Sequence, residues 1–289
     1  MKVVLGGAFG NLGSDVLKEL IKQGHEVVAI DLKERELAGV DKNSYTFKAI
    51  NACDASTLVG VCDGADVVIS TIGLTGASAT LSHYDIDYQG NLNLLNEAKK
   101  VNVKHFTYIS VIKADQAPDI PMLDAKAKFE KELKNSGISY VIHRPTGYFY
   151  DIAKVFWPMI EKGKVTLLGK KDIHANVIST EDFASFIVKS MLEDNKQYNV
   201  GGKETLSYKE IATLFFEAAS KKPVIKHAPT WVFDILAKLP KIKKSGRSAI
   251  IKFSKWTLTN EMVGDTVYGD MIFSEYIKKY VQDKLKEVK

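Results

Sequence analysis

The stretch Lys2–Gly13, KVVLGGAFGNLG, decides the fold. A short apolar run leads into three glycines, Gly7, Gly10 and Gly13, spaced G-x-x-G-x-x-G, and apolar residues then recur at helical spacing. In such a unit the first glycine permits a tight turn, the second lets the backbone approach a pyrophosphate, and the third allows the helix to pack closely on the strand. The start of the helix offers unbonded N–H groups to an anion. The stretch therefore predicts a dinucleotide-binding strand–turn–helix unit.

A carboxylate follows where such a unit needs one. Asp31 ends the apolar run EVVAID, 18 residues after Gly13. A carboxylate here accepts hydrogen bonds from the ribose hydroxyls of adenosine, and it disfavours a 2′-phosphate, which carries the same charge. Lys33 and Arg35 follow directly and would neutralise such a phosphate. We expect NAD or NADP as the cofactor, with a slight preference for NAD.

Seven short apolar runs alternate with helical patterns as far as residue 200, which predicts an α/β fold built on a doubly wound parallel sheet. Most of the runs are continuous, as strands covered on both faces must be. They are residues 2–7, 26–31, 45–50, 66–71, 105–110, 139–144 and 197–202. Apolar spacing predicts helices between the first two runs and over Tyr208–Ser220, the latter with Ser207 as N-cap.

The alternation fails from Pro223 onward, where the chain looks helical or irregular. We predict an NAD(P)-binding Rossmann domain over residues 1–220 and a small, mostly helical lobe over residues 221–289 that forms part of the substrate site. The lobe carries 15 Lys and Arg against 7 Asp and Glu, although the whole chain has a net charge of only +5. An apolar helix pattern beside basic residues, at positions 231–247, fits a lid helix or an element lying on an anionic membrane. We favour the lid over peripheral membrane contact.

Composition excludes several other classes of protein. With 45% hydrophobic and 26% charged residues, the chain resembles ordinary globular proteins. It has no apolar stretch near the roughly 18 residues of a membrane span, and its first residues lack the apolar core of a secretory signal. Two cysteines make no disulfide framework, no His/Cys spacing resembles a metal site, and the aromatics are not interleaved with positive charge as nucleic-acid stacking requires. We expect a cytoplasmic protein that binds neither a metal nor nucleic acid. The sequence does not indicate the oligomeric state.

Five stretches together resemble the atypical and extended short-chain dehydrogenase/reductase superfamily, in particular the NmrA-like proteins and isoflavone-reductase-like enzymes. The resemblance covers roughly residues 1–220. It implies a Rossmann fold and an NAD(P)-dependent oxidoreductase, or an epimerase-like enzyme, acting on a small organic substrate. The stretches are GAFGNLG, ADVVIST, DYQGNLNLLNEAKKVNVKHFTYISV, AKAKFEKELKNSGISYVIHRPTGYF and HANVISTEDFASFIV.

The resemblance also implies roles for individual residues. The pyrophosphate loop would consist of Gly7, Phe9, Gly10, Asn11 and Leu12. Asp31 would contact the ribose, and the adenine edge would lie at Asn51 and Ala52. The stretch under the cofactor would be Thr71, Ile72 and Gly73. Ser110 and Lys126 match the serine and lysine of the family's Ser-Tyr-Lys set, and the loop beside the nicotinamide would contain Pro145 and Tyr148. We assign no role to Asp87, where several extended relatives carry asparagine.

The chain departs from this pattern at Met122, in PMLDAKAKFE (residues 121–130). Active members carry a tyrosine there, four residues before the lysine and therefore one helical turn away. The lysine ammonium then makes the phenol a usable proton donor near neutral pH. A thioether cannot donate a proton. The standard tyrosine-assisted reduction is therefore not expected of Met122.

Three hypotheses remain for the chemistry. Lys126 binds the nicotinamide ribose of a protein that reduces nothing, or Lys126 is itself the acid, as in the isoflavone-reductase-like relatives, or a phenol such as Tyr148 or Tyr150 replaces the missing one. The leading prediction is an oxidoreductase with Lys126, Ser110 and Tyr148 as candidate catalytic residues. The rival is a non-catalytic NAD(P) redox sensor, and the third is an assembly factor with a captive nucleotide. We expect His143 to be a packing residue.

Overall fold

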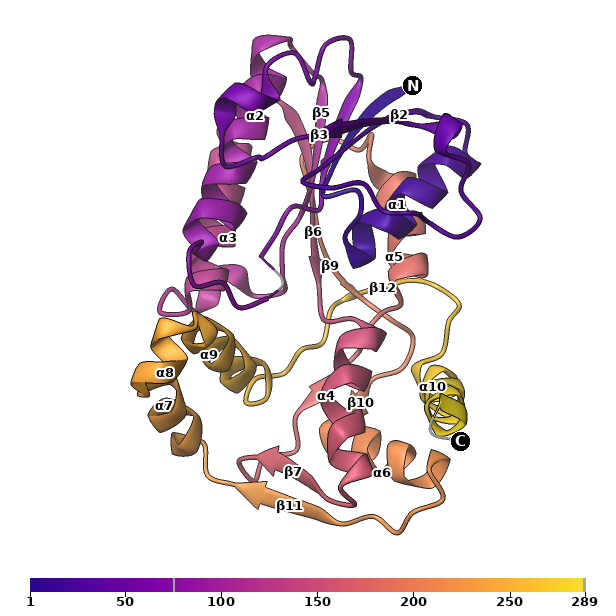
Figure 1. Ribbon diagram of the computed structural model, residues 1–289, viewed down its shortest axis with the longest axis vertical. Coiled ribbons are helices and arrows are strands. Elements are labelled where there is room, and N and C mark those ends of the chain that lie inside the picture. The colour runs from indigo at the N-terminus through magenta and orange to yellow at the C-terminus, as the bar shows by residue number, and fades with distance from the viewer. Residues whose placement is uncertain (75, 288–289) are drawn as a thin grey trace. The chain divides into compact units, whose positions relative to one another are not determined.

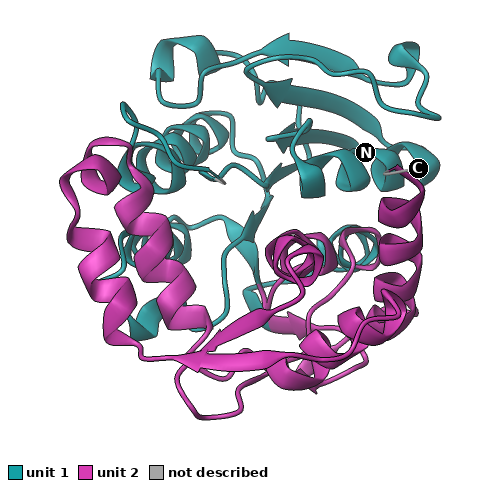
Figure 2. Cartoon of the chain, turned by 60° about the horizontal axis from the view of Figure 1, so that its bottom comes forward, with its two compact units in different colours: residues 1–144, 183–198 teal, residues 145–182, 199–289 magenta. Residues whose placement is uncertain are grey.

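The computed structural model describes residues 1–74 and 76–287, and the chain forms two compact units (Figure 2). Unit 1 comprises residues 1–144 and 183–198, and unit 2 comprises residues 145–182 and 199–289. This division differs from the predicted boundary at residue 220. Residues 145–182 group with segments that follow residue 198, and a scan along the sequence cannot detect such a grouping.

The framework is an eight-stranded sheet with the order β12-β9-β6-β5-β4-β1-β2-β3. The pairs β1–β2, β1–β4, β2–β3, β4–β5, β5–β6 and β9–β12 are parallel. All seven predicted strands are present, which confirms the doubly wound parallel sheet. The strands are β1 (Lys2–Gly6), β2 (Glu26–Asp31), β3 (Thr46–Ala49), β4 (Val67–Ser70), β5 (His105–Ile109), β6 (Ser139–Pro145), β9 (Lys196–Gly201) and β12 (Thr266–Val267).

The winding of the sheet reverses beside β1. The chain first runs outward through β2 and β3, then returns to β4 on the other side of β1 and continues to β5 and β6. Ligands of doubly wound sheets bind outside the carboxyl ends of the strands at this reversal. The ends of β1 and β4 are therefore where a cofactor site is expected.

Helices cover both faces of the sheet in unit 1. Figure 1 shows α2 (Asn91–Lys100) and α3 (Pro121–Lys134) on one face, and α1 (Asn11–Lys22) and α5 (Thr180–Ser190) on the other. The core under α2 and α3 contains fully buried Phe106, Tyr108, Phe129 and Leu133. The rings of Tyr108 and Phe129 lie 4.5 Å apart, edge to face. This packing fixes α3, which carries Lys126, against β5.

An ion pair also holds α3 in register. The Arg144 guanidinium at the end of β6 donates to both carboxylate oxygens of Glu130, with Nε 2.9 Å from Oε1 and Nη2 2.5 Å from Oε2. Both residues are buried. Removing one partner of a buried pair typically costs about 3–5 kcal/mol, because the other charge is left uncompensated. Glu130 is one helical turn from Lys126, so the ion pair also fixes the position of the turn of α3 that carries Lys126.

Short helical segments connect the strands of unit 1. Three are 3₁₀ turns, η1 (Lys42–Ser44), η2 (Ala55–Leu58) and η4 (Ala114–Gln116). The segment η3 (Tyr84–Gly90) is π-helical and continues into α2. Wide π turns inside helices are rare and frequently mark functional sites.

Unit 2 is mostly helical after residue 228, as predicted for the end of the chain. Its helices are α4 (Phe149–Glu161), α6 (Tyr208–Ala218), α7 (Trp231–Lys238), α8 (Pro240–Lys244), α9 (Arg247–Thr257) and α10 (Phe273–Glu287). The predicted N-cap of α6 is confirmed, since Ser207 Oγ accepts from the Glu210 amide at 3.2 Å and the Glu210 carboxylate accepts from the Ser207 amide at 2.7 Å. This reciprocal capping box fixes where α6 starts.

Two small strand pairs in unit 2 were not predicted. β7 (Val165–Leu168) pairs in parallel with β11 (Ile225–Ala228), and β8 (His174–Ala175) pairs antiparallel with β10 (Leu206–Ser207). Strands of two to four residues are too short to show a period-two pattern.

His143 is a core residue, as expected. Its side chain is fully buried, and Nε2 lies 2.8 Å from Ser190 Oγ, whose hydroxyl donates to the Phe186 carbonyl at 2.7 Å. Burial lowers the pKa of His143 to about 3. The ring is therefore neutral at physiological pH and takes no part in acid–base chemistry.

This buried ring makes stability depend on pH. In the unfolded chain His143 has its ordinary pKa of 6.5, and in the folded chain the pKa is about 3. Between these values the unfolded state binds the extra proton, so the free energy of unfolding falls as the pH is lowered from 6.5 toward 3. The limiting slope is about 1.4 kcal/mol per pH unit. The free energy of unfolding, measured in urea across this pH window, should depend less steeply on pH for His143→Phe than for the wild type. Equal slopes would contradict the assignment.

Candidate functional site: a glycine loop beside a buried lysine

The turn after β1 leaves no room for a side chain at Gly7 or Gly13. Gly7 has φ +74°, in the left-handed region that favours glycine, and a Cβ on Gly13 would lie 2.0 Å from the Gly7 carbonyl oxygen. The first turn of α1 is thus pressed against the loop. The N–H groups of that turn have no intrahelical acceptor. The arrangement fits a pyrophosphate, which would accept from these amides.

Asp31 ties this loop to the end of β2. Its Oδ2 accepts from the Phe9 amide at 2.9 Å, and its Oδ1 accepts from the Leu32 amide at 2.7 Å. The Gly7 and Ala8 amides donate to the carbonyl of Ile30 at 2.9 and 3.2 Å. A carboxylate can accept about four hydrogen bonds. Asp31 therefore supports the loop and still has acceptor positions for a ribose.

The side chain of Phe9 has a structural role. It is 3% exposed and packs edge to face on Tyr45 and Phe47, with ring centroids 5.9 and 5.6 Å apart. Phe9 therefore contributes to the loop through its amide, which Asp31 holds, and its ring fixes the loop over β3.

The other predicted cofactor residues of unit 1 lie in the segments that follow β3 and β4 and in the first turn of α1. Thr71 Oγ1 lies 2.9 and 3.1 Å from the carbonyl oxygens of Gly6 and Gly7. Asn51 Oδ1 accepts from the Cys53 amide at 3.2 Å, and the Ala52 carbonyl accepts from Asn93 at 2.9 Å. Thr71 thus joins the end of β4 to the glycine turn. Asn11 is exposed and Leu12 is buried in the first turn of α1.

Beyond Thr71 the chain passes directly to a group of buried charges. A Cβ on Gly73 would lie 2.9 Å from Asp87 Oδ1 and 3.5 Å from Lys126 Nζ. The Ile72 carbonyl accepts from the side-chain Nδ2 of Asn91 at 3.2 Å. The stretch predicted to run under the cofactor therefore connects the glycine loop to Lys126.

Lys126 is held by a chain of buried polar groups. Its ammonium, on a residue that is 9% exposed, lies 3.1 Å from Asp87 Oδ1 and donates to the Ile109 carbonyl at 3.2 Å. Asp87 Oδ2 lies 2.7 Å from His83 Nδ1. Asp87 and His83 are only 1% and 3% exposed. Among the described residues Oδ1 of Asp87 accepts no well-directed hydrogen bond despite the short contact, so its interaction with Lys126 is an ion pair. The three side chains form a continuous line.

Sequence reasoning assigned no role to Asp87 and did not consider His83. They are four residues apart, the spacing that brings side chains together on a helix, and this was the available signal. The π-helical segment η3 carries Asp87, and Asn91 fixes this segment by donating to the Asp87 carbonyl at 3.0 Å. Asn91 Oδ1 also accepts from Ser70 Oγ at 2.5 Å. The network is therefore anchored to the end of β4.

Ser110 lies next to this network with a free hydroxyl. It is 4% exposed, its amide donates to the His143 carbonyl at 2.7 Å, and its Oγ is buried without a hydrogen-bond partner among the described residues. Leaving a buried hydroxyl unpaired costs about 1–3 kcal/mol. Such a group is suited to a ligand atom that would pair with it.

Met122 and the nearest phenol of unit 1 offer no replacement acid. Met122 is half-buried in the first turn of α3. The ring of Tyr108 lies 5.3 Å from Lys126 Nζ, but burial first, and then the charge of Asp87, raises the pKa of Tyr108 well above its ordinary value. A fully buried phenol with a raised pKa is a poor proton donor near neutral pH.

Tyr148 and Pro145 belong to unit 2, so their predicted proximity to Lys126 and Ser110 stays a prediction. Tyr148 stacks on Tyr150 with ring centroids 5.6 Å apart. Desolvation first, and then Tyr150 and Asp151, raises the pKa of Tyr148 well above its ordinary value. This shift disfavours Tyr148 as the missing acid.

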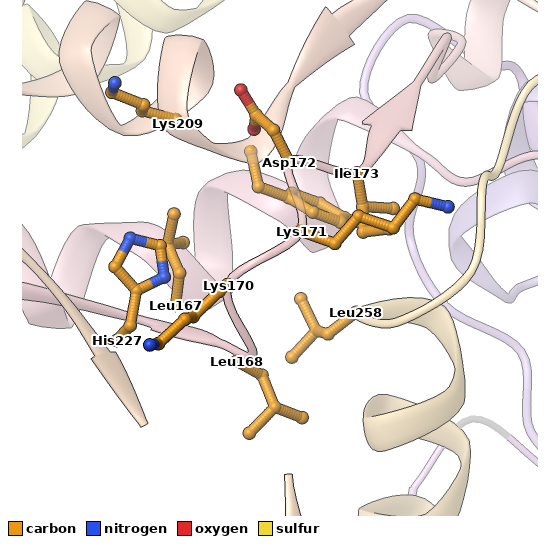
Figure 3. A pocket seen from close by; sticks show the side chains of 10 residues that line it. Leu167, Leu168, Lys170, Lys171, Asp172, Ile173, Lys209, His227 and Leu258 are labelled. Carbon is orange, nitrogen blue, oxygen red and sulfur yellow. The ribbon is translucent and has the colours of Figure 1, made fainter. Parts of the chain in front are cut away.

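A cavity of about 160 Å³ lies within unit 2 (Figure 3). Its apolar lining includes Leu168, Ile173 and Leu258, and Figure 3 shows Lys171 and Lys209 extending to opposite sides. Leu258 comes from the predicted terminal lobe. A role for this lobe in holding a substrate stays a prediction.

The described part of the chain contains no group of three or more His, Cys, Asp or Glu side chains able to hold a metal ion. Within residues 1–74 and 76–287, no helix is both long and apolar enough to cross a bilayer.

Comparison with known proteins identifies the family of the chain. Residues 7–194, more than half of the chain, match the family described as NAD(P)H-binding. The chain belongs to this NAD(P)H-binding family of atypical short-chain dehydrogenase/reductases. It is 28% identical over 240 residues to the photosystem II assembly factor Ycf39 of Synechocystis, covering 82% of this chain and 73% of that protein. It is 29% identical over 264 residues to divinyl chlorophyllide a 8-vinyl-reductase of Arabidopsis thaliana, covering 82% of this chain but only 62% of the reductase.

Solved structures confirm the fold. NADPH-dependent quinone oxidoreductase QOR2 of Escherichia coli, in complex with NADPH, superimposes with a TM-score of 0.75 at 18% identity, covering 99% of this chain and 100% of that one. Triphenylmethane reductase of Citrobacter gives a TM-score of 0.74 at 17% identity, covering 98% and 100%. The fold is therefore that of these proteins.

Gly13→Ala tests the loop. A methyl group at this position would overlap the Gly7 carbonyl, so α1 must move away from the turn that presents its amides. We expect the dissociation constant for NADH or NADPH, measured by calorimetry, to rise at least about tenfold, which corresponds to about 1.4 kcal/mol. Ser14→Ala, one residue further along α1, is the matched control and should bind like the wild type. Unchanged binding by Gly13→Ala would rule out the glycine loop as the pyrophosphate site.

Proposed function

We propose that the chain is an NAD(P)H-dependent reductase of a small organic substrate in which Lys126 is the proton donor. The observation that carries the proposal is the buried Lys126 ammonium, paired with Asp87 at 3.1 Å and adjacent to the stretch that leaves the glycine loop. Burying a lysine in this way is costly unless it is paired. A helix-surface lysine with only a structural role would be exposed, as Lys128 is.

The residues that would hold the cofactor follow from the site. The amides of the first turn of α1 would bind the pyrophosphate, Asp31 the adenosine ribose, and Thr71–Gly73 would lie beneath the nicotinamide half. When bound, NAD(P)H supplies a hydride.

Reduction by a hydride also requires a proton, and Lys126 would provide it. The ammonium would protonate the substrate atom that gains negative charge, and the Ser110 hydroxyl, which has no partner in the described part of the chain, would donate a hydrogen bond to the same atom. Hydride and proton together complete a two-electron reduction. Asp87 would hold the Lys126 ammonium at 3.1 Å, and His83 would hold Asp87 at 2.7 Å. His83 and Asp87 would thus be positioning residues, and the neutral amine left after the transfer would regain its proton from water once the product has left.

The relatives support a reductase without naming this chain's substrate. A curated relative and structural neighbours are named as reductases or oxidoreductases. We propose a small, apolar electrophile such as a quinone, an enone or an aldehyde, because Lys126 and Ser110 would stabilise negative charge developing on oxygen.

A second candidate is a non-catalytic protein that binds NAD(P) and regulates or assembles a partner. Met122 favours this candidate, because the family's tyrosine proton donor is missing. The similarity to a photosystem II assembly factor favours it as well. In this case Lys126 would only bind the nicotinamide ribose.

Lys126→Ala separates these functions, with Lys128→Ala as the matched control. Lys128 lies two residues further along α3, is exposed, and pairs with Asp124 at 2.7 Å. Removing a general acid typically lowers the rate about 10²–10⁴-fold. We expect Lys126→Ala to lose NAD(P)H consumption across a panel of quinones, enones and aldehydes by such a factor, and Lys128→Ala to retain it. Cofactor affinity, measured separately, should remain.

Two results would overturn the reductase. Full turnover by Lys126→Ala would exclude Lys126 as the acid. A wild-type chain that reduces nothing in the panel, but binds oxidised and reduced cofactor with clearly different affinities, would establish the sensor in its place.

Asp31 provides the test of coenzyme choice. We propose that NAD(H) is the slightly preferred coenzyme, because the Asp31 carboxylate would repel a 2′-phosphate while Lys33 and Arg35 are exposed and could partly offset it. Asp31→Asn keeps an acceptor for the loop amides and removes the charge. The ratio of NADH to NADPH dissociation constants should shift toward NADPH by about tenfold. In the control, Arg35→Ala, the ratio should shift toward NADH or stay unchanged. A shift toward NADH in Asp31→Asn would contradict the proposal.

A further inference from the structure

The three helices α7, α8 and α9 bury almost none of their residues. Among their residues only Ala237 is buried. Large apolar side chains of this segment are instead exposed to solvent. They are Trp231 at 58%, Ile235 at 53%, Leu236 at 38% and Leu239 at 43%. Single exposed apolar residues are ordinary, but four within nine positions form a patch that needs an explanation.

Strong positive charge surrounds this apolar patch. Residues 231–257 contain seven Lys and Arg and a single acidic residue, Asp234, a net charge of +6. Asp234 is already paired with Lys255, at 2.7 Å. The basic residues nearest the patch follow it directly in the chain and are exposed: Lys238, Lys241, Lys243, Lys244 and Arg247.

From this combination we propose that α7 and α8 form a docking surface for an anionic lipid membrane. Apolar side chains, Trp above all, insert at the boundary between headgroups and acyl chains, and nearby lysines attract acidic headgroups at about 1 kcal/mol each. Lysine stems are long enough to lie along the apolar zone while their ammonium groups stay at the headgroups. The surface thus complements a bilayer in both polarity and charge.

The geometry of the segment also fits a bilayer surface. α7 has eight residues and is therefore only about 12 Å long, so it would lie in the interface and not span the membrane. Leu239 and Pro240 end α7 and start α8, which brings the lysine-rich turn next to the apolar helix (Figure 1). An acidic protein partner would satisfy the charge, but four exposed apolar side chains beside a diffuse cluster of lysines are better matched by a fluid anionic surface than by fixed carboxylates.

Vesicle flotation of the full chain tests this docking surface. We expect binding to vesicles of phosphatidylcholine mixed equally with phosphatidylglycerol, and little binding to phosphatidylcholine alone. High salt should weaken the binding, because it screens exposed charges. No binding to the anionic vesicles would overturn the proposal and leave an acidic protein as the partner to seek.

Two sets of variants locate the surface. The triple variant Lys241→Glu, Lys243→Glu, Lys244→Glu and the double variant Trp231→Ser, Ile235→Ser change exposed side chains, so the fold should be retained; circular dichroism checks this. Each should reduce the vesicle-bound fraction at least about tenfold. The matched control, Lys278→Glu with Lys279→Glu, reverses two exposed charges on α10 and should bind like the wild type. Equal loss in the control would show that net charge, and not this surface, governs binding and would overturn the assignment.

Discussion

The buried carboxylate of Asp87 is the charge on which the candidate site depends. A lysine ammonium as deeply buried as that of Lys126 requires compensation, because removing an unpaired charge from water costs several kcal/mol. Asp87 supplies it at 3.1 Å, and His83 in turn holds the second oxygen of Asp87 at 2.7 Å. Even Gly73 is constrained by this network, since a Cβ there would lie 2.9 Å from Asp87 Oδ1.

The surrounding fold supports this network from two sides. On one side Asn91 binds the backbone of the π-helical segment that carries Asp87 and reaches the end of β4 through Ser70. On the other side the Arg144–Glu130 pair and the packing of Phe129 hold α3 against the sheet. The network therefore lies at the reversal of the sheet, beside the glycine loop, where a dinucleotide would bring its reactive half.

The sequence alone predicted the parts that depend on neighbours along the chain. Continuous apolar runs marked seven strands of the sheet, glycine spacing marked the loop, and Ser207 marked a helix start, because each pattern is local. The network at Lys126 was only half predicted. Lys126 and Ser110 came from family resemblance, whereas the spacing of His83 and Asp87 could indicate only that these two side chains meet; their pairing with Lys126 depends on η3 lying beside α3. The strands β7, β8, β10 and β11 were missed because they are too short for periodicity. Phe9 was placed in the right loop, but its packing on Tyr45 and Phe47 could not be read from spacing.

A double-mutant cycle on Asp87 and Lys126 tests the central claim most directly. Asp87→Asn and Lys126→Met, alone and together, would be compared by the free energy of unfolding in urea. If the two side chains form one buried unit, each single variant strands its partner, and the double variant loses less than the sum by at least about 1 kcal/mol. Additive losses, within about 0.5 kcal/mol, would show that the two groups do not interact and would contradict the account.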